Sequence, residues 1–402
     1  MPPNLSRRRL MGFAASGGVA VFLPGCTTPD RGPSVPVGDA TQATVLGLPN
    51  ERFFPLTGIA PLEAEFNAAV VRLHRTFRVA TTAQMPELEL LALSGGAENG
   101  AFGAGLLCGW TEHGGRPTFE LVTGISAGAL IAPFAYLGAE YDTQLRIFTQ
   151  LTPDKVLTKR GFTAALFDDA MTDNQPLFKT ISSYMTEEIV AAIAVAYGQG
   201  RLLLVATTDL DAQQPVFWNI GAIAQSGDPR ALDTIRRVLL ASAAIPGIFP
   251  PSMIDVTLNG TRYQEMHVDG GALAQTFLYP QSLMTQRQEK LARGEPVIRL
   301  KAYVIRNGRL DPQWTDVERR TLPIAERAIS TMTTASGFND VVRIYTNTQR
   351  DGIGFNLAYI DTDFTMKLPQ PFDPGYMRAL FDYGYQRGRG GYDWAHKPPF
   401  FS

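Results

Sequence analysis

The stretch Leu121-Val122-Thr123-Gly124-Ile125-Ser126-Ala127-Gly128-Ala129-Leu130 decides the fold. The mostly apolar run at residues 119–122 predicts a buried strand, and Ser126 stands at the turn before a helix of small residues. Gly-x-Ser-x-Gly at a strand-to-helix corner is the nucleophile-elbow pattern, in which a strained turn presents the serine hydroxyl. Gly124 and Gly128 remove Cβ atoms that would collide at such a corner. On its own, the pattern is also typical of small residues that line a close helix–strand contact.

A second strand and a glycine-rich turn stand just upstream. Residues 88–93 are a largely apolar run of strand length, and Ser94-Gly95-Gly96-Ala97-Glu98-Asn99-Gly100 leads into a helix that continues to about His113. Backbone N–H groups at such a turn point at an anion in front of them. Because one βα unit separates this turn from Ser126, a right-handed crossover would set the two loops side by side. A nucleophile beside unpaired N–H donors is the arrangement that acyl transfer needs.

Two cofactor-binding loops compete for the glycine turn. A dinucleotide fingerprint requires Gly-x-Gly-x-x-Gly and a ribose-binding acid about 20 residues further on. The spacing here fits only approximately, and the next strand delivers a serine elbow instead. A P-loop requires Gly-Lys-Ser/Thr, which this turn lacks. We therefore expect no cofactor.

The third segment, Met266-His267-Val268-Asp269-Gly270-Gly271-Ala272, lies far downstream. It predicts a short strand that ends in an acid, followed by two glycines, Gly270 and Gly271, that let the backbone approach a neighbour closely. Alone, Asp-Gly-Gly is more often a plain turn. In combination with the elbow and the glycine turn, Asp269 supplies the missing base.

Together the three segments resemble the patatin-like phospholipase family, whose members use a Ser–Asp dyad. Residues 207–211 (Thr-Thr-Asp-Leu-Asp) and 241–251 (Ala-Ser-Ala-Ala-Ile-Pro-Gly-Ile-Phe-Pro-Pro) also resemble the family pattern. The resemblance covers about residues 88–276. It implies an α/β protein with a three-layer α/β/α fold and a mainly parallel central sheet.

The resemblance also implies roles for individual residues. Ser126 would be the nucleophile and Asp269 the general base, with the backbone of Gly95, Gly96 and Ala97 as the oxyanion hole. The sequence departs from the family at two positions. Ala97 stands where the family often has a third glycine, and Asn99 stands where it often has a basic residue. A basic side chain there would assist anionic headgroups, so the preference for phospholipids stays open.

The expected reaction is hydrolysis of an ester through an acyl-serine intermediate, with a lipid ester as substrate. An aspartate with an ordinary pKa near ~3.9 is a poor base for serine. Each well-aimed oxyanion donor supplies roughly 2.7–4 kcal/mol, so the glycine turn would matter as much as the base. Headgroup, acyl chain and cleaved position are not specified, and neither is hydrolase against acyltransferase activity.

Two rival interpretations remain. The order Ser126, Asp269, His396 fits a Ser-Asp-His triad of the α/β-hydrolase type. Against it, the oxyanion loop and elbow of that fold are separated by more than one βα unit, and His396 lies in a proline-rich tail. The other rival is a non-catalytic lipid-binding lipoprotein. His267 projects to the same side of its strand as Asp269, and we expect a structural role for it; we expect His74 to be a packing or surface residue.

Residues 1–26 predict a bacterial lipoprotein signal peptide. A positive n-region (Ser6-Arg7-Arg8-Arg9) and a short apolar h-region precede Leu23-Pro24-Gly25-Cys26, which resembles a lipobox. Cys26 would then be lipidated and anchor the chain to a membrane. Because Thr27 follows it, we expect an outer-membrane lipoprotein that faces the periplasm. An ordinary signal peptide or an uncleaved anchor remains the alternative.

The remaining chain predicts a single hydrolase domain at residues 51–402 with a C-terminal extension, after a flexible tether at residues 27–50. Helices are predicted at 61–80, 186–199, 230–242, 324–342 and 375–388, with another starting at 277–283, and a flap or helical insertion at 149–175. Strands are predicted at 201–207, 215–220, 297–306, 344–345 and 355–361, and a hairpin at 256–268. The proline-stiffened loop at 245–251 is interpreted either as a wall of an acyl pocket or as plain core packing.

Composition supports a globular enzyme. Apolar residues make up 45% of the chain, which gives ample core, and a net charge of −2 argues against a nucleic-acid role. Cys108 is expected to be a buried apolar residue and not a nucleophile. No His, Cys or carboxylate cluster in the sequence has metal-ligand spacing, so we expect no metal. The oligomeric state is not specified.

Overall fold

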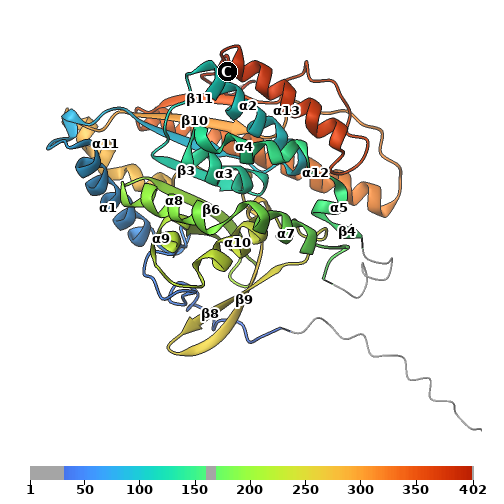
Figure 1. Ribbon diagram of the computed structural model, residues 1–402, viewed down its shortest axis with the longest axis horizontal. Helices are drawn as coiled ribbons and strands as arrows, with labels where there is room; N and C mark the ends of the chain where they lie inside the picture. Colours follow the sequence, from blue (N-terminus) through green and yellow to red (C-terminus); the bar gives the residue numbers. More distant parts are fainter. Residues whose placement is uncertain (1–30, 160–168, 401–402) are drawn as a thin grey trace, which may run out of the picture.

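The computed structural model describes residues 31–159 and 169–400, shown in Figure 1. The signal peptide, Cys26 and residues 27–30 of the expected tether lie outside the described residues. The strands are β1 Arg52–Phe53, β2 Leu88–Leu93, β3 Leu121–Ile125, β4 Thr158–Lys159, β5 Thr172–Asp173, β6 Leu202–Asp209, β7 Gln214–Asn219, β8 Ser252–Leu258, β9 Thr261–Asp269, β10 Leu300–Arg306 and β11 Gly354–Tyr359. The helices are α1 Ala60–Phe77, α2 Gly100–His113, α3 Ala127–Leu137, α4 Asp142–Leu145, α5 Pro153–Val156, α7 Gln175–Tyr184, α8 Glu187–Gly198, α9 Ile220–Gln225, α10 Ala231–Ser242, α11 Thr285–Ala292, α12 Thr321–Arg350 and α13 Pro374–Arg389.

A central sheet has the strand order β1-β7-β6-β3-β2-β10-β11. The strands β6, β3, β2, β10 and β11 are parallel, whereas β7 runs antiparallel to β6. The hairpin β8–β9 joins through the end of β9, which pairs with the end of β6. Parallel strands bring their carboxyl ends to one edge of the sheet, where α/β proteins place their sites. Ser94, Ser126 and Arg306 all follow or end strands at this edge.

Helices cover both faces of the sheet, because successive strand residues point to opposite sides. Leu91 and Leu93 pack into a core with residues of α2, α3, α10 and α13, whereas Leu90 and Ala92 pack into a second core with residues of α1 and α12. The expected three-layer α/β/α architecture with a mainly parallel sheet is therefore confirmed. Figure 1 shows α13 beside α2 on one side of the sheet.

The two βα units around the glycine turn and Ser126 fold as the sequence predicts. The strand at 88–93 is β2, and the helix that ends at His113 is α2. The strand before Ser126 is β3, and the small-residue helix after it is α3. Because β2 and β3 are parallel neighbours, their two carboxyl-terminal loops lie side by side.

One predicted helix begins later than expected, and one predicted strand is wrong. The helix expected to start at 277–283 begins later in that range, with a 3-10 turn at Gln281–Met284 that leads into α11; Phe277, Leu278 and Tyr279 are buried in irregular chain, and Pro280 disfavours a helical residue before it. The expected strand at 344–345 lies inside α12. There, Ile344 shares a buried helical face with Val341 and Thr348, so the apolar pair belongs to a 3.6-residue period and not to a strand.

The composition-based tether is also corrected for residues 31–50. These residues form no long helix or strand, yet they are held against the hairpin β8–β9. Thr44 forms an isolated bridge with Thr257, and Gln264 donates from its backbone to the Pro33 carbonyl at 2.8 Å. Ala43 is buried. Backbone pairing to a neighbouring hairpin therefore orders a stretch without apolar periodicity.

The expected flap at 149–175 contains the short elements α5, β4 and β5, which flank residues outside the described part. Among the helices of the described chain, no helix has both the length and the apolar character required to cross a bilayer.

Candidate active site

Ser126 occupies the strained corner between β3 and α3. Its φ of 55° and ψ of −125° are values that an L-residue rarely adopts, and such a conformation costs on the order of 1–3 kcal/mol. Ser242 at the end of α10 holds the corner: its hydroxyl accepts the Ser126 N–H at 3.0 Å and donates to the Ala206 carbonyl at 2.7 Å. Both serines are buried. Ser242 thus fixes the elbow to β6.

The two glycines of the elbow are required by close backbone approach. A Cβ on Gly124 would lie 2.6 Å from the Gly128 carbonyl oxygen, and one on Gly128 would lie 2.3 Å from the Leu93 carbonyl oxygen. Backbone oxygens cannot move aside cheaply, so both positions exclude any side chain. This agrees with the role that the sequence indicates for these two glycines.

Asp269 lies beside Ser126 in space, although the two residues are 143 positions apart in the sequence. Asp269 is the last residue of β9 and pairs with Thr207 of β6, which is the strand next to β3. The carboxylate accepts the Gly271 N–H at 2.7 Å, and the Ser126 side chain lies close enough to lower its pKa. Burial raises the pKa of Asp269 to about 7, and the neighbouring Ser126 side chain and the Gly271 N–H lower it only in part. Asp269 is therefore a stronger base than an ordinary aspartate.

Gly270 and Gly271 shape the turn after this aspartate. A Cβ on Gly270 would meet the Ala206 carbonyl oxygen at 2.7 Å, and one on Gly271 would lie 3.0 Å from the Asp269 carboxylate. The Gln275 side chain donates to the Gly271 carbonyl at 2.8 Å. The glycine pair therefore allows the Gly271 amide to reach the carboxylate that it holds.

The glycine turn lies against the elbow, because a Cβ on Gly95 would be only 3.2 Å from the Ser126 Cβ. The Gly95 N–H donates to the Gln275 carbonyl at 2.9 Å and is therefore already paired. Within the described chain, no acceptor is found for the N–H groups of Gly96 and Ala97. Ala97 has a φ of 48°, on the left-handed side that favours glycine, which gives a physical reason for a glycine at this position in similar sequences.

A buried arginine supports the glycine turn from below. Arg306, at the end of β10, donates to the Gly95 carbonyl at 3.0 Å and to the Ser94 hydroxyl at 3.1 Å. Burial lowers its pKa to about 10, so it remains a cation at neutral pH. Asn307 follows it and pairs with the Ser94 carbonyl at 2.8 Å; a Cβ on Gly96 would clash with the Asn307 carbonyl oxygen at 2.0 Å.

An apolar pocket opens beside Ser126. It is a small cavity of about 30 Å³ whose lining includes Ala97 and Ser126 themselves. Most of the other lining side chains are aliphatic or aromatic and come from five segments: Leu130, Phe148, Leu151, Val156, Leu177, Ile245, Phe249, Phe372 and Met377. Ile245 and Phe249 belong to the proline-stiffened loop, which therefore contributes to the pocket wall. The predicted flap contributes Leu151 and Val156.

Comparison with known proteins assigns the domain that contains this geometry. Residues 91–279 match the family model described as patatin-like phospholipase. Residues 91–279 are a patatin-like phospholipase domain. Such a domain is a lipid acyl hydrolase in general terms. Among solved structures, VipD from Legionella pneumophila is similar over 76% of this chain and 67% of its own, at 12% sequence identity and a TM-score of 0.35. No curated protein matches the chain.

His396 does not lie near the patatin-like site. Its Nδ1 is 3.2 Å from the Phe355 carbonyl oxygen. Strand register aligns Phe355 with Ala302, Leu90 and then Leu121, the first residue of β3. Ser126 follows five positions later, about 16 Å further along the strand direction at about 3.3 Å per residue. The geometry therefore argues against a triad that contains His396. His74 contacts the Val79 carbonyl at the end of α1, which agrees with a structural role.

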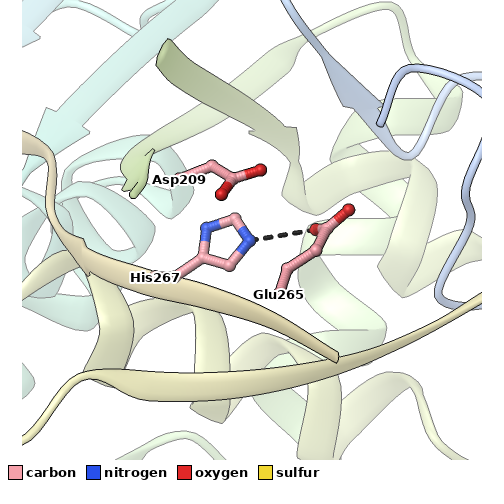
Figure 2. A group of neighbouring side chains, drawn as sticks. All are labelled: Asp209, Glu265 and His267. Carbon is pink, nitrogen blue, oxygen red and sulfur yellow. Dashed lines mark hydrogen bonds and ion pairs between the residues drawn. The ribbon is translucent and has the colours of Figure 1, made fainter. Parts of the chain in front are cut away.

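His267 belongs to a buried network on the strand that ends at Asp269. Figure 2 shows His267 and Glu265 on one strand with Asp209 nearby. The Trp218 indole donates to the Thr207 hydroxyl, which also lies 2.9 Å from His267 Nδ1. His267 Nε2 lies 3.1 Å from the Glu265 carboxylate, and because an ionised carboxylate can only accept, the nitrogen donates.

The same three side chains have ligand atoms within 4.8 Å of one another, a spacing compatible with a metal. The sequence pattern did not reveal this group, because Asp209 comes from a different strand. Although burial raises the pKa of Glu265, hydrogen bonding from His267 and the Arg52 guanidinium lower it to about 2. Asp209 accepts the backbone N–H groups of Asp211 and Ala212. Because the Arg52 guanidinium already pairs with the Glu265 carboxylate, we interpret Asp209, Glu265 and His267 as a structural network between β6 and β9.

Several site residues were not found from the sequence: Ser242, Gln275, Arg306 and Asn307. Arg306 ends a clean parallel strand and Asn307 follows it, and the rule that sites form at the carboxyl ends of such strands would have indicated them. Ser242 lies within a segment that resembles the family pattern. A serine among alanines does not, however, indicate that its hydroxyl accepts the backbone N–H of Ser126. Cys108 is buried, and burial raises the pKa of its thiol to about 12, which does not suit a nucleophile.

Proposed function

We propose that this chain is a serine acyl hydrolase that cleaves ester bonds of membrane lipids, in the manner of a phospholipase A or lysophospholipase. Ser126 is the nucleophile and Asp269 is the general base. The observation that carries the proposal is a serine on a strained corner whose side chain lies beside a buried Asp269, the pKa of which is raised to about 7. A base with a pKa close to neutrality combines a useful ionised fraction with real proton affinity.

The reaction proceeds in two steps. Asp269 accepts the hydroxyl proton as Ser126 Oγ attacks the ester carbonyl, and the developing oxyanion accepts hydrogen bonds from the N–H groups of Gly96 and Ala97. Collapse expels the alcohol and leaves an acyl-serine. Water then attacks with Asp269 again as base. Because the Gly95 amide is paired with Gln275, it serves to fix the turn and is not one of the two donors.

The substrate side of the proposal rests on the apolar pocket. Aliphatic and aromatic side chains such as Leu130 and Phe249 beside the nucleophile suit an acyl chain better than a polar group. Asn99, which stands in place of a basic residue, uses its side-chain oxygen to accept the Tyr376 hydroxyl at 2.8 Å. It offers no cation to a phosphate, so we expect a weak headgroup preference.

A non-catalytic lipid-binding protein is the second candidate. It accounts for the apolar pocket, but it requires neither a strained serine nor a carboxylate held against it. In a protein that only binds lipid, the strained backbone of Ser126 would serve no purpose. Labelling separates the two candidates: an active-serine fluorophosphonate probe should modify wild type and leave Ser126→Ala unmodified. Absence of labelling in folded wild-type protein would favour the binding role.

The decisive experiment compares hydrolysis by wild type and Ser126→Ala, first on a soluble short-chain ester and then on isolated bacterial membranes. We expect the variant to lose at least about a thousandfold in kcat, and lipid analysis should show free fatty acids only with wild type. Ser252→Ala is the matched control, because Ser252 is a buried serine on β8 outside the site. Retention of activity by Ser126→Ala would contradict the proposal.

We further propose that Cys26 carries the lipid anchor of an outer-membrane lipoprotein that faces the periplasm. The lipobox-like Leu23-Pro24-Gly25-Cys26 supports this. Metabolic labelling with a radioactive fatty acid tests it. We expect label in wild type and none in Cys26→Ala, and equal labelling of the two would exclude the anchor.

A further inference from the structure

The first half of α12 turns its apolar side chains toward solvent, unlike an ordinary surface helix. Its large apolar side chains are exposed: Ile324 by 49%, Ile329 by 62% and Met332 by 70%. Together with three exposed alanines (Ala325, Ala328 and Ala335) they fall within an arc of about 140°, at about 100° per residue. A surface helix normally turns such an arc toward the core.

The side of the helix that turns toward the protein is polar instead. Arg327, Thr333 and Thr334 are less exposed than the apolar residues around them. Arg327 donates to the Gln313 carbonyl, which ties the preceding loop to this side of the helix. The next residue in that loop, Trp314, is 90% exposed. An uncovered apolar helix face is therefore accompanied by an uncovered tryptophan.

The second half of α12 is anchored at the active site. Asp340 accepts the backbone N–H groups of Gln275 and Thr276, at 2.6 and 3.3 Å, in the loop that follows Asp269. Gly337 lies against Arg306, because a Cβ there would be 2.7 Å from the guanidinium. Leu273 in the same loop is 43% exposed. Exposed apolar residues thus lie both in the loop at the site and on the first half of the helix, which extends to one margin of the molecule in Figure 1.

We propose that the apolar face of α12, defined by Ile324, Ile329 and Met332 together with Trp314, docks on a phospholipid bilayer. The domain is a lipid acyl hydrolase, so its substrate reaches the site from a lipid surface. An apolar face on a helix whose other end holds the loop after Asp269, beside a tryptophan, has the form of an interfacial anchor. Insertion of this face would hold the loop after Asp269 near the bilayer, because Asp340 of the same helix binds that loop. The inference rests on the proposed function only in that the substrate is a bilayer lipid.

Vesicle binding tests the proposal separately from catalysis. Vesicles of phosphatidylethanolamine and phosphatidylglycerol are sedimented with full-length Ser126→Ala protein, which leaves the lipids intact. A second protein carries Ile324→Ser, Ile329→Ser and Met332→Ser in addition. The matched control carries Leu56→Ser, Val71→Ser and Val195→Ser, which are exposed by 73%, 50% and 63% on other parts of the surface. All three proteins keep the same N-terminus, so any binding through it is common to them.

We expect the α12 variant to bind vesicles at least about tenfold more weakly than the control variant. Spin-labelled lipid should quench the tryptophan fluorescence of the Ser126→Ala protein, and Trp314→Phe should remove most of that quenching. The α12 variant should keep wild-type kcat/KM on a soluble ester when Ser126 is restored. Equal vesicle binding by the α12 and control variants would overturn the proposal. So would a wild-type dimer in sedimentation that the α12 variant loses, because the occupant would then be a second copy of the chain.

Discussion

At the scale of single residues, the pKa of Asp269 near 7 determines how the proposed reaction responds to pH. Only the ionised carboxylate can accept the Ser126 proton, and burial is the main cause of the raised pKa. We therefore expect kcat/KM on a soluble, non-ionising ester to rise about tenfold per pH unit below pH 7 and to level off above it. A stopped assay from pH 5 to 9 measures this. A plateau that already begins near pH 4.5 would mean that Asp269 titrates as an ordinary aspartate and is not the base as described.

The same residue makes a prediction about stability. Its folded pKa, about 7, lies above the unfolded value of about 3.9. Protonation of Asp269 therefore favours the fold, fully below pH 4, and this contribution is lost as pH rises to 7. Asp269→Asn does not titrate and keeps an oxygen for the Gly271 N–H. Relative to wild type it should gain stability between pH 4 and 7, by roughly 4 kcal/mol at most. Urea unfolding at pH 5 and pH 8 measures the gain, which should accompany a loss of activity.

Unchanged relative stability at the two pH values would show that the carboxylate is solvated in the folded state. The matched control is Asp233→Asn, an exposed aspartate on α10 whose side chain is 55% accessible. Its contribution should vary little with pH because exposed pairs are worth about 0–1 kcal/mol.

The sequence predicted those site residues whose role depends on local backbone geometry. Gly124, Ser126 and Gly128 were predicted from the nucleophile-elbow pattern together with the glycine turn upstream, and Asp269 was linked to them by resemblance. The hydrogen bond of Ser242 to the elbow and the cation of Arg306 under the glycine turn were not predicted. Both depend on which strands are neighbours in space, and a single buried serine or arginine carries no periodic signal of that arrangement.

At the scale of elements, α2 and α13 pack backbone to backbone through four glycines. A Cβ on Gly105 or Gly109 of α2 would lie 2.0 Å from the carbonyl oxygen of Phe381 or Tyr385. Gly384 and Gly388 of α13 make matching approaches to α2. The small residues thus set how close the two helices lie, and α2 in turn begins at the glycine turn of the site.

Gly105→Ala should therefore force α13 away from α2. We expect a loss of roughly 1–3 kcal/mol in the free energy of unfolding, as for other overpacked contacts, measured by urea denaturation. Gly58→Ala is the control, because a Cβ there meets nothing within 4 Å, and it should change stability little. Equal stability of the two variants would indicate that the helices separate without cost.

Elements with a clear period were predictable and others were not. The strand β2 and the helix α10 appear where their patterns place them, because each has one face or one run of apolar residues. The run Phe277 to Tyr279 shows neither the period of a helix nor that of a strand. Tertiary burial at the end of the sheet decides its conformation, and the Thr123 hydroxyl donates to its first carbonyl.

At the scale of the whole molecule, the folded unit is larger than the matched domain. The match ends at residue 279, yet β10 lies between β2 and β11 in the sheet. Residues after 279 also supply Arg306 and Asn307, which hold the glycine turn, and α13, which covers α2. The part that the sequence indicated as a C-terminal extension therefore completes both the core and the site.

A chain that ends at residue 299 should consequently fail to fold. Removal of β10 leaves β2 without one of its two neighbours, and a strand with buried Leu90 and Leu91 becomes an open edge. The glycine turn loses the groups that hold its carbonyls, so even a collapsed form would lack an ordered oxyanion site. We expect aggregation and no cooperative melting by circular dichroism, whereas the full-length chain melts cooperatively. A soluble 1–299 chain that hydrolyses a short-chain ester would show instead that the matched domain folds alone and that the C-terminal strands only stabilise it.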